Sequence, residues 1–178
     1  NGGDDARLLA DGRFPTPDGR ARFVPVRQEG PAQAASPAFP LTLNTGRLRD
    51  QWHTMTRTGL TPRLMANAPR PVADLNPLDA AGNGLGEGDL VRLTTPYGFA
   101  RARVRITQDQ QRGHAFLPIH WSGRFAANAG AGGLSCPAAD VFSGQPELKN
   151  VPLQIRREAV AWEGVLITRR DLRPTGFV

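Results

Sequence analysis

Short apolar runs separated by turn-forming residues recur along the chain and predict strands rather than long helices. Residues 99–106 alternate apolar and arginine side chains, a pattern typical of a strand with one buried face. The other runs are four to six residues long and are bounded by glycine, proline or polar residues. The predicted strands cover residues 39–44, 71–75, 90–94, 99–106, 114–119, 151–155 and, at an edge, 165–168.

Two local signals connect these strands. Pro96-Tyr97-Gly98 predicts a turn that pairs the strands before and after it as a hairpin. Asn76 and Pro77 are suited to the N-cap and first position of a short helix, and the glycine-rich residues 82–86 end it. Five or six short strands, one capped helical turn and long loops indicate a closed β-barrel. Periodicity alone does not separate this barrel from an oligonucleotide-binding-type barrel.

Composition divides the chain into three parts. Residues 1–38 mix glycine, proline and charge, which is the composition of a lead-in and linker from a preceding domain. Residues 39–157 hold the compact barrel, and residues 158–178 form a truncated C-terminal extension. The chain begins at Asn1 without an initiator methionine, so we expect an excised piece of a longer protein.

The densest chemistry follows the first predicted strand. Residues 45–59 read Thr-Gly-Arg-Leu-Arg-Asp-Gln-Trp-His-Thr-Met-Thr-Arg-Thr-Gly. Backbone amides and threonine hydroxyls can face phosphate oxygens, and an arginine such as Arg47 can bind phosphate through two hydrogen bonds. The indole and imidazole of Trp52 and His53 can pack on a heteroaromatic plane. This stretch therefore favours a large anionic, heteroaromatic ligand.

Several function classes find no support in the sequence. The single Cys136 excludes an internal disulfide and a cysteine-rich iron–sulfur or zinc site. The three histidines, at positions 53, 114 and 120, lack metal-ligand spacing, and no catalytic triad or paired carboxylates are evident. We therefore assign no metal ligand and no catalytic residue. No apolar run approaches the roughly 20 residues of a membrane span.

The net charge of +6 comes almost entirely from arginine, since Lys149 is the one lysine. The chain has no lysine-rich tail and no ladder of aromatic residues between basic ones. Nucleic-acid binding is therefore not expected, and a cofactor with two pyrophosphate groups is an adequate counterpart for part of the positive charge.

Four ordered segments resemble those of the molybdopterin oxidoreductases, and assimilatory nitrate reductases most closely. Residues 45–59 resemble the stretch that opens the C-terminal domain of these enzymes, and residues 14–23 resemble its lead-in. Residues 116–121 (Phe-Leu-Pro-Ile-His-Trp) and 143–149 (Ser-Gly-Gln-Pro-Glu-Leu-Lys) resemble its later cofactor-facing loops. The resemblance spans about residues 10 to 155.

This resemblance implies a double-psi β-barrel that binds a bis-(molybdopterin guanine dinucleotide) molybdenum cofactor shared with other domains. The iron–sulfur cluster is then expected in the missing N-terminal part, and oxygen-atom transfer reduces nitrate to nitrite. The matched motifs, together with Asn128 and Asp140 in the loop between the last two, predict a set of cofactor-binding residues. These are Thr45, Gly46, Arg47, Trp52, His53, Thr54, Thr56, His120, Trp121, Asn128, Asp140, Gln145 and Lys149.

The implied partners are the remaining domains of the same polypeptide and a reductase or ferredoxin as electron donor, in a cytoplasmic enzyme. We expect the isolated piece to be inactive, with an open basic groove lined by Arg47, His53 and His120. Two alternatives stay open. One is the same domain of a formate dehydrogenase or periplasmic nitrate reductase. The other is a non-enzymatic β-barrel module that binds nucleic acid or a protein partner.

Overall fold

The chain separates into two compact units, Asn1–Gly30 and Pro31–Val178. The computed structural model describes residues 7–25, 27, 29–164 and 169. The described residues of the first unit form turns, held for example by hydrogen bonds from the Thr16 hydroxyl to Asp18 and to the Arg20 carbonyl. The predicted strand at 165–168 lies outside the described residues. The domain limits drawn from composition stay a prediction.

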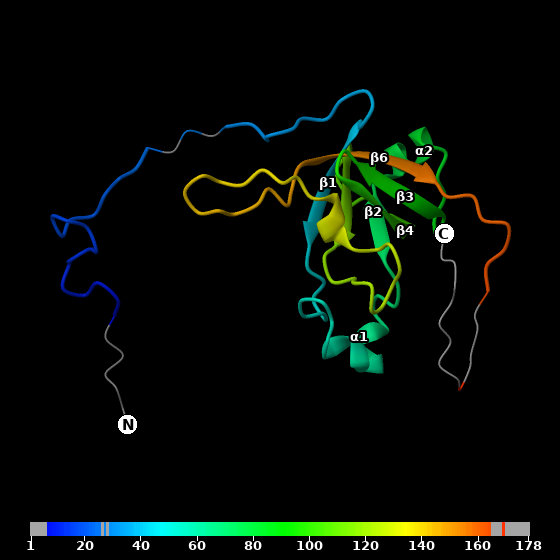
Figure 1. Ribbon diagram of the computed structural model, residues 1–178, viewed down its shortest axis with the longest axis horizontal. Coiled ribbons are helices and arrows are strands. Elements are labelled where there is room, and N and C mark those ends of the chain that lie inside the picture. Colours follow the sequence, from blue (N-terminus) through cyan, green and yellow to red (C-terminus); the bar gives the residue numbers. More distant parts are fainter. Residues whose placement is uncertain (1–6, 26, 28, 165–168, 170–178) are drawn as a thin grey trace. The chain divides into compact units, whose positions relative to one another are not determined.

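The strands lie where the apolar runs predict them, all within the second unit (Figure 1). The predicted helix α2 spans Pro77–Gly82 and begins with proline at its first position. The Asn76 side chain caps it by accepting a 3.0 Å hydrogen bond from the Leu78 amide. The six strands are β1 Leu41–Gly46, β2 Val72–Leu75, β3 Leu90–Thr95, β4 Gly98–Ile106, β5 His114–Pro118 and β6 Val151–Arg157.

Three short helical elements were not predicted. They are the single turns η1 (Thr58–Leu60) and η2 (Ala131–Leu134) and the four-residue helix α1 (Pro62–Met65). Elements of this length are too short to show an apolar repeat, so the sequence pattern does not reveal them. Both η1 and α1 lie in the long connection between β1 and β2.

The strands close into one barrel in the order β1-β5-β2-β4-β3-β6. The pairs β1·β5 and β2·β4 are parallel, and the other four pairs are antiparallel. Replacing β1, β2 and β3 by β4, β5 and β6 reproduces the same ring with the same strand directions. The barrel thus consists of two interlocked halves, β1 to β3 and β4 to β6, which are joined by two equivalent parallel strand pairs, and this is the double-psi arrangement. The predicted fold class is confirmed, including the β3–β4 hairpin.

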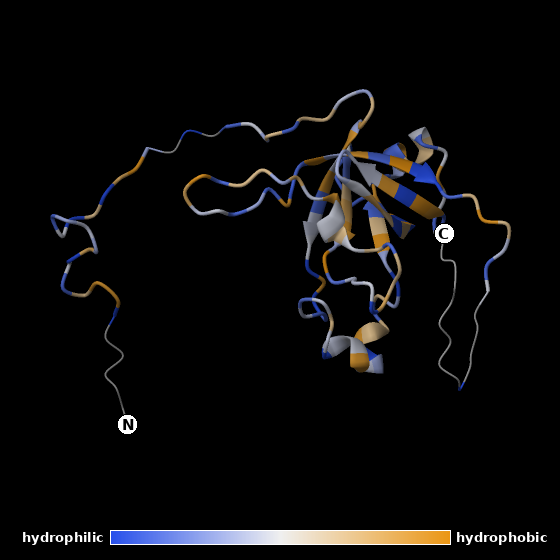
Figure 2. Cartoon of the chain, viewed as in Figure 1, coloured by the Kyte–Doolittle hydropathy of each residue, from blue (hydrophilic) through white to orange (hydrophobic). Residues whose placement is uncertain are grey.

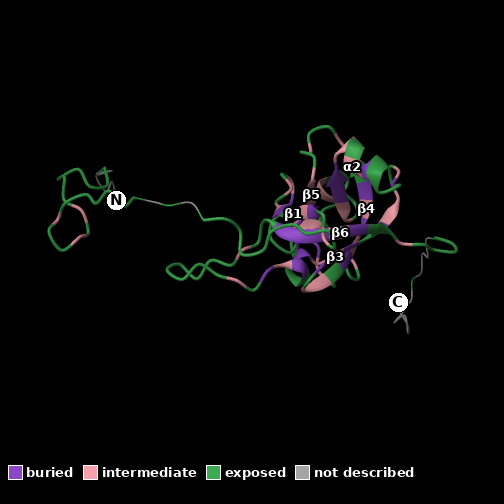
Figure 3. Cartoon of the chain, turned by 90° about the horizontal axis from the view of Figure 1, so that it is seen from above, coloured by how far each residue is buried: buried purple, intermediate pink, exposed green. Residues whose placement is uncertain are grey.

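Apolar and polar side chains alternate along the strands, and the apolar ones point into the barrel and form its core. On β4, Ala100, Ala102 and Val104 are buried, while the arginines between them point outward. Figure 2 shows this as alternating apolar and polar bands on the strands, and Figure 3 shows the buried positions inside the barrel. Small residues on β4 leave room for the leucines of the facing strands. The fully buried leucines are Leu43, Leu75, Leu93, Leu117, Leu134 and Leu153.

Shortening a core leucine tests this packing. Leu117 lies on β5, between β1 and β2, and is fully buried. We predict that Leu117→Ala lowers the free energy of unfolding by about 2–5 kcal/mol, because it removes apolar contacts and leaves a cavity. Leu78→Ala is the matched control, since Leu78 is 60% exposed on α2. Equal losses for both variants in urea unfolding would contradict the packing described.

Candidate functional site at one end of the barrel

Parallel pairing of β1 and β5 places the loops that follow them at the same end of the barrel. Gly46 pairs with Pro118, and the Ile119 amide donates a 2.9 Å hydrogen bond to the Gly46 carbonyl. The connection through residues 47–61 and the loop of residues 119–130 therefore start side by side. Helix α1 lies beyond this end of the barrel (Figure 1). We call this region the β1/β5 end.

A buried histidine joins the two loops. The His120 side chain is fully buried, and its Nε2 accepts a 2.8 Å hydrogen bond from the Leu48 amide. Its Nδ1 lies 2.6 Å from the His53 carbonyl oxygen. Because a backbone amide only donates and a carbonyl only accepts, this network assigns a neutral imidazole with its proton on Nδ1. His120 thus fixes both ends of residues 48–53.

A small second hydrophobic core, separate from the barrel core, packs against this loop. Met55, Trp121 and Ala129 are buried together, apart from the barrel core. Met55 turns inward with a φ of 60°, and His53 has a φ of 43°. Such left-handed backbone is unfavourable for residues with a Cβ, so the surrounding contacts must hold it. A Cβ on Gly59 would lie 2.7 Å from the Phe125 ring, so this close approach requires glycine.

Gln51 ties the same loop to α1. Its side chain is nearly buried, and its Oε1 accepts a 2.7 Å hydrogen bond from the Thr58 hydroxyl. Its Nε2 donates to the Leu64 carbonyl at 3.3 Å. The Thr58 hydroxyl oxygen also accepts from the Trp52 amide at 3.3 Å. Residue types alone did not single out Gln51 or Thr58, because their role depends on which loop atoms lie within reach.

The polar groups of the loop that remain exposed form a cluster on its outer side. Trp52 is 61% exposed, and the Arg47 guanidinium lies 5.6 Å from the centre of its ring. The rings of Trp52 and His53 meet edge to face with centres 4.7 Å apart. Thr54 and Thr56 are exposed on the same loop. These five residues present a cation, two heteroaromatic rings and two hydroxyls from ten consecutive positions.

Lys149 reaches the same end from the other side of β1. Its Nζ donates to the Asn44 side chain at 3.2 Å and to the Thr45 carbonyl. The Thr45 hydroxyl donates to the Leu148 carbonyl at 2.9 Å. Thr45 is therefore buried in this junction, and its hydroxyl stabilises the segment that carries Lys149. A pocket of about 180 Å³ lies beside it, lined by Thr45, Ile119, Ala131, Gly132, Ser135 and Leu148.

The remaining predicted residues lie farther along the chain. Asn128 has a φ of 52°, and its carbonyl accepts a 2.6 Å hydrogen bond from the Arg101 amide on β4. Asp140 and Gln145 lie in the 139–146 hairpin, which projects from the barrel and is closed by pairing of Ala139 with Pro146 (Figure 1). The Gln145 side chain is exposed and donates to the Pro146 carbonyl at 3.4 Å.

Asp140 stabilises the turn of this hairpin. Its Oδ1 accepts hydrogen bonds from the amides of Phe142 and Ser143 at 3.1 and 2.7 Å, and from the Ser143 hydroxyl at 2.9 Å. These donors, the Ser143 amide foremost, hold the pKa of Asp140 below its usual value of 3.8.

Two of the expected contributions, those of His120 and Trp121, require correction. His120 does not line an open groove, because it is fully buried and bonded to backbone atoms through both nitrogens. Trp121 is 4% exposed within the second core and presents no open ring face. Its Nε1 is buried without a hydrogen-bond partner in the described residues. At Gly46, the Phe116 ring occupies the space that a Cβ would take, at 2.7 Å, and the predicted role of Gly46 in cofactor binding stays a prediction.

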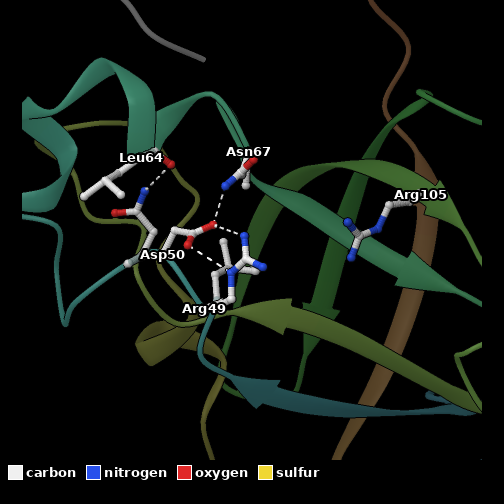
Figure 4. A pocket seen from close by; sticks show the side chains of 8 residues that line it. Arg49, Asp50, Leu64, Asn67 and Arg105 are labelled. Atoms are coloured by element: carbon white, nitrogen blue, oxygen red, sulfur yellow. Dashed lines mark hydrogen bonds and ion pairs between the residues drawn. The ribbon is translucent and has the colours of Figure 1, made fainter.

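A pocket of about 210 Å³ lies on the inner side of the same loop, between residues 48–51 and α1 (Figure 4). The Asp50 carboxylate accepts hydrogen bonds from the Arg49 guanidinium at 3.0 and 3.1 Å and from the Asn67 amide. The Arg49 bonds, followed by the Asn67 bond, lower the pKa of Asp50. The carboxylate thus already accepts three hydrogen bonds, and it links residue 50 to the segment after α1.

The described residues offer neither a cluster of metal ligands nor a membrane-spanning helix. No group of three or more histidine, cysteine or acidic side chains there is placed to hold a metal ion. No helix among them is long and apolar enough to cross a membrane.

Comparison with known proteins identifies the family. The model of the molydopterin dinucleotide binding domain matches residues 41–152. A nitrate reductase of Klebsiella oxytoca is 44% identical over 156 residues, which cover 87% of this chain and 18% of that protein. The F420-dependent formate dehydrogenase subunit alpha of Methanocaldococcus jannaschii is 31% identical, over 85% of this chain and 22% of its own length.

Acetylene hydratase from Pelobacter acetylenicus contains a structure of the same fold, with a TM-score of 0.59 and 18% sequence identity. The superposition covers 67% of this chain and 18% of that protein. The chain belongs to the molybdopterin dinucleotide binding domain family, whose members are parts of oxidoreductase enzymes. It spans about a fifth of the length of the curated relatives it matches.

Removing the imidazole of His120 tests the loop architecture. We predict that His120→Ala lowers the free energy of unfolding by about 2–4 kcal/mol, because two backbone groups lose buried hydrogen bonds. Hydrogen exchange at the Leu48 amide should accelerate more than exchange in the barrel strands. His114→Ala is the control, since His114 begins β5 and is partly exposed. Unchanged exchange at Leu48 in the His120→Ala variant would rule out the bridge.

Acid should loosen the 139–146 hairpin through Asp140. Because the folded-state pKa is lowered, the ionised carboxylate stabilises the turn above pH 3.8, and this stabilisation is lost as the pH falls through the folded pKa. We expect hydrogen exchange at the Ser143 amide to become less protected, relative to the intrinsic rate, over that acidic range. In Asp140→Asn the same protection should not vary with pH; a transition of equal size there would exclude Asp140 as its source.

Proposed function

We propose that the β1/β5 end binds the dinucleotide part of a bis-(molybdopterin guanine dinucleotide) cofactor in a longer nitrate reductase. The observation that carries this proposal is the clustering of Arg47, Trp52 and His53 on a loop that buried contacts hold rigid. Family membership supplies the ligand class, and the 44% identity to a nitrate reductase favours nitrate over formate as the substrate.

The residues at this end fit an anionic dinucleotide. Arg47 is exposed and has no carboxylate partner among the ion pairs of the described residues. Its guanidinium is free to donate two parallel hydrogen bonds to a pyrophosphate oxygen pair. The hydroxyls of Thr54 and Thr56 add donors on the same loop. Trp52 offers an exposed aromatic surface, on which a guanine or pterin plane can stack.

Four further residues complete the proposed binding set from other segments. Lys149 contacts β1 near its C-terminal end and would add a second positive charge near the pyrophosphates. Asp140 keeps Oδ2 free of the turn hydrogen bonds made by Oδ1, so it can accept from the donor edge of a guanine. Gln145 and the side chain of Asn128 are exposed and can donate or accept.

Residues inside the structure would act by positioning the exposed ones. His120, Gln51 and Thr45 make hydrogen bonds within the protein and so would not need to rearrange when the cofactor binds. Such preorganisation lowers the entropy lost on binding. Trp121 and Met55 would support the loop from the second core without contacting the cofactor.

The bound cofactor would supply the redox-active molybdenum at which nitrate is reduced to nitrite. This domain would close one wall of the cofactor cleft, exclude water from the pyrophosphates and set the position of the metal. We assign the remaining cleft, the substrate funnel and the iron–sulfur cluster to other domains of the polypeptide. The enzyme would be assimilatory and cytoplasmic, with a reductase or ferredoxin as electron donor.

The charge of Arg47 gives the sharpest test of cofactor binding. A hydrogen bond from a charged donor is worth roughly 1.5–3 kcal/mol, so Arg47→Ala in the longer enzyme should weaken cofactor retention by about tenfold to a hundredfold. Molybdenum and acid-released guanine nucleotide per protein should fall together. Arg112→Ala removes the same charge from an exposed loop before β5 and should retain both. Full cofactor content in Arg47→Ala would refute the assignment.

Substrate identity needs a separate assay with the cofactor-loaded longer enzyme. With reduced methyl viologen as electron source we expect nitrite to form from nitrate, and with oxidised methyl viologen we expect no formate oxidation. Formate oxidation without nitrate reduction would assign the domain to a formate dehydrogenase. That result would leave the cofactor-binding proposal intact, because the two assays report different steps.

A further inference from the structure

Three adjacent strands carry a row of arginines across the outer face of the barrel. Arg92 on β3 lies directly opposite Arg101 on β4 and, on its other side, directly opposite Arg156 on β6. Neighbouring strands are about 4.8 Å apart, so the three backbone positions span only about 10 Å. We call Arg156, Arg92 and Arg101 the arginine row. Like charges directly opposite each other destabilise a sheet, so the stability of the barrel does not explain the row.

An aromatic ring holds part of the row in place. Phe99 on β4 is 37% exposed, and the Arg92 guanidinium carbon lies 3.9 Å from the centre of its ring. The Arg101 guanidinium carbon lies 5.5 Å from the same centre. Contact with the ring face is attractive for a cation and restricts its rotamers. The row therefore offers ordered guanidinium groups next to a partly exposed apolar surface.

The charge of the row is only partly balanced within the described residues. Arg101 pairs with Glu158 at 2.8 Å, while Arg92 and Arg156 have no carboxylate partner there. Other arginines on the outer faces do have one: Arg105 pairs with Asp74 at 2.6 Å, and Arg157 pairs with Asp89 at 2.5 Å. Arg92 and Arg156 thus provide two adjacent, exposed and uncompensated charges.

We propose that the arginine row is a docking site for a protein partner that presents a cluster of carboxylates. Arginine and aromatic side chains together are typical of protein interfaces, and acidic groups on a partner would relieve the repulsion within the row. The site lies on β3, β4 and β6, and so it does not depend on the function proposed for the loops after β1 and β5.

The surroundings of the row favour an acidic protein over a nucleic acid. Glu158 lies beside Arg101, and Glu163 pairs with Arg103 two residues farther along β4. A nucleic acid needs a continuous basic path for its phosphates, whereas these carboxylates limit the positive region to a short patch. A compact acidic cluster fits a patch of this size.

A defined probe can test the site in the 178-residue chain. The probe is a short glutamate-rich peptide with both termini blocked, titrated at low salt while backbone amide and arginine Nε–H shifts are recorded. We expect the largest shifts at Arg92, Phe99 and Arg156. Two exposed ion pairs are together worth roughly 1 kcal/mol, so Arg92→Ala/Arg156→Ala should weaken binding about fivefold to tenfold.

The control variant is Arg63→Ala/Arg112→Ala, which removes the same charge from exposed positions on other elements. It should bind the peptide within about twofold of the unaltered chain. The proposal is overturned if the peptide does not bind, if both double variants lose affinity equally, or if the shifts map elsewhere. A single-stranded DNA oligomer of equal net charge that binds more tightly at the same residues would overturn it in favour of nucleic acid. Amide spectra of both variants verify that the barrel is folded.

Discussion

The buried imidazole of His120 is the contact on which the β1/β5 end depends. It accepts from the Leu48 amide and donates to the His53 carbonyl, so one side chain from the loop after β5 fixes six residues of the loop after β1. This is possible because β1 and β5 are parallel neighbours that end together. Met55 adds a second anchor by packing on Trp121 in spite of its left-handed backbone. The exposed arginine and aromatic groups are held in place by these buried contacts.

The strands were predictable because their signal is local. Alternation on residues 99–106 and the Pro-Tyr-Gly turn before them determine which side chains face inward, whatever the rest of the chain does. The order of strands around the barrel depends on pairings between distant residues, and family resemblance supplied it. The strand pairing itself supports that topology, since exchanging β1, β2 and β3 with β4, β5 and β6 leaves the strand order and directions unchanged.

The sequence indicated candidate residues for the site, but it did not reveal which of them are buried. The resemblance predicted His120 and Trp121 as cofactor-binding residues, yet both are buried, and His120 is hydrogen-bonded to backbone atoms. The sequence does not show whether these two side chains are buried, because they lie in the loop just after an apolar strand, where side chains can face either the protein or the solvent. Gln51 was missed for the related reason that its partners Thr58 and Leu64 become neighbours only after the loop folds back. Exposed residues such as Arg47 are those for which residue chemistry is most informative.

A structure of the longer enzyme with its cofactor bound would test the central claim most directly. The account predicts a pyrophosphate oxygen within hydrogen-bond distance of the Arg47 guanidinium, and a purine or pterin ring against Trp52. It also predicts that the His120 hydrogen bonds are unchanged from those in this structure. A dinucleotide bound to another face of the barrel, with Arg47 and Trp52 in solvent or against protein alone, would contradict it.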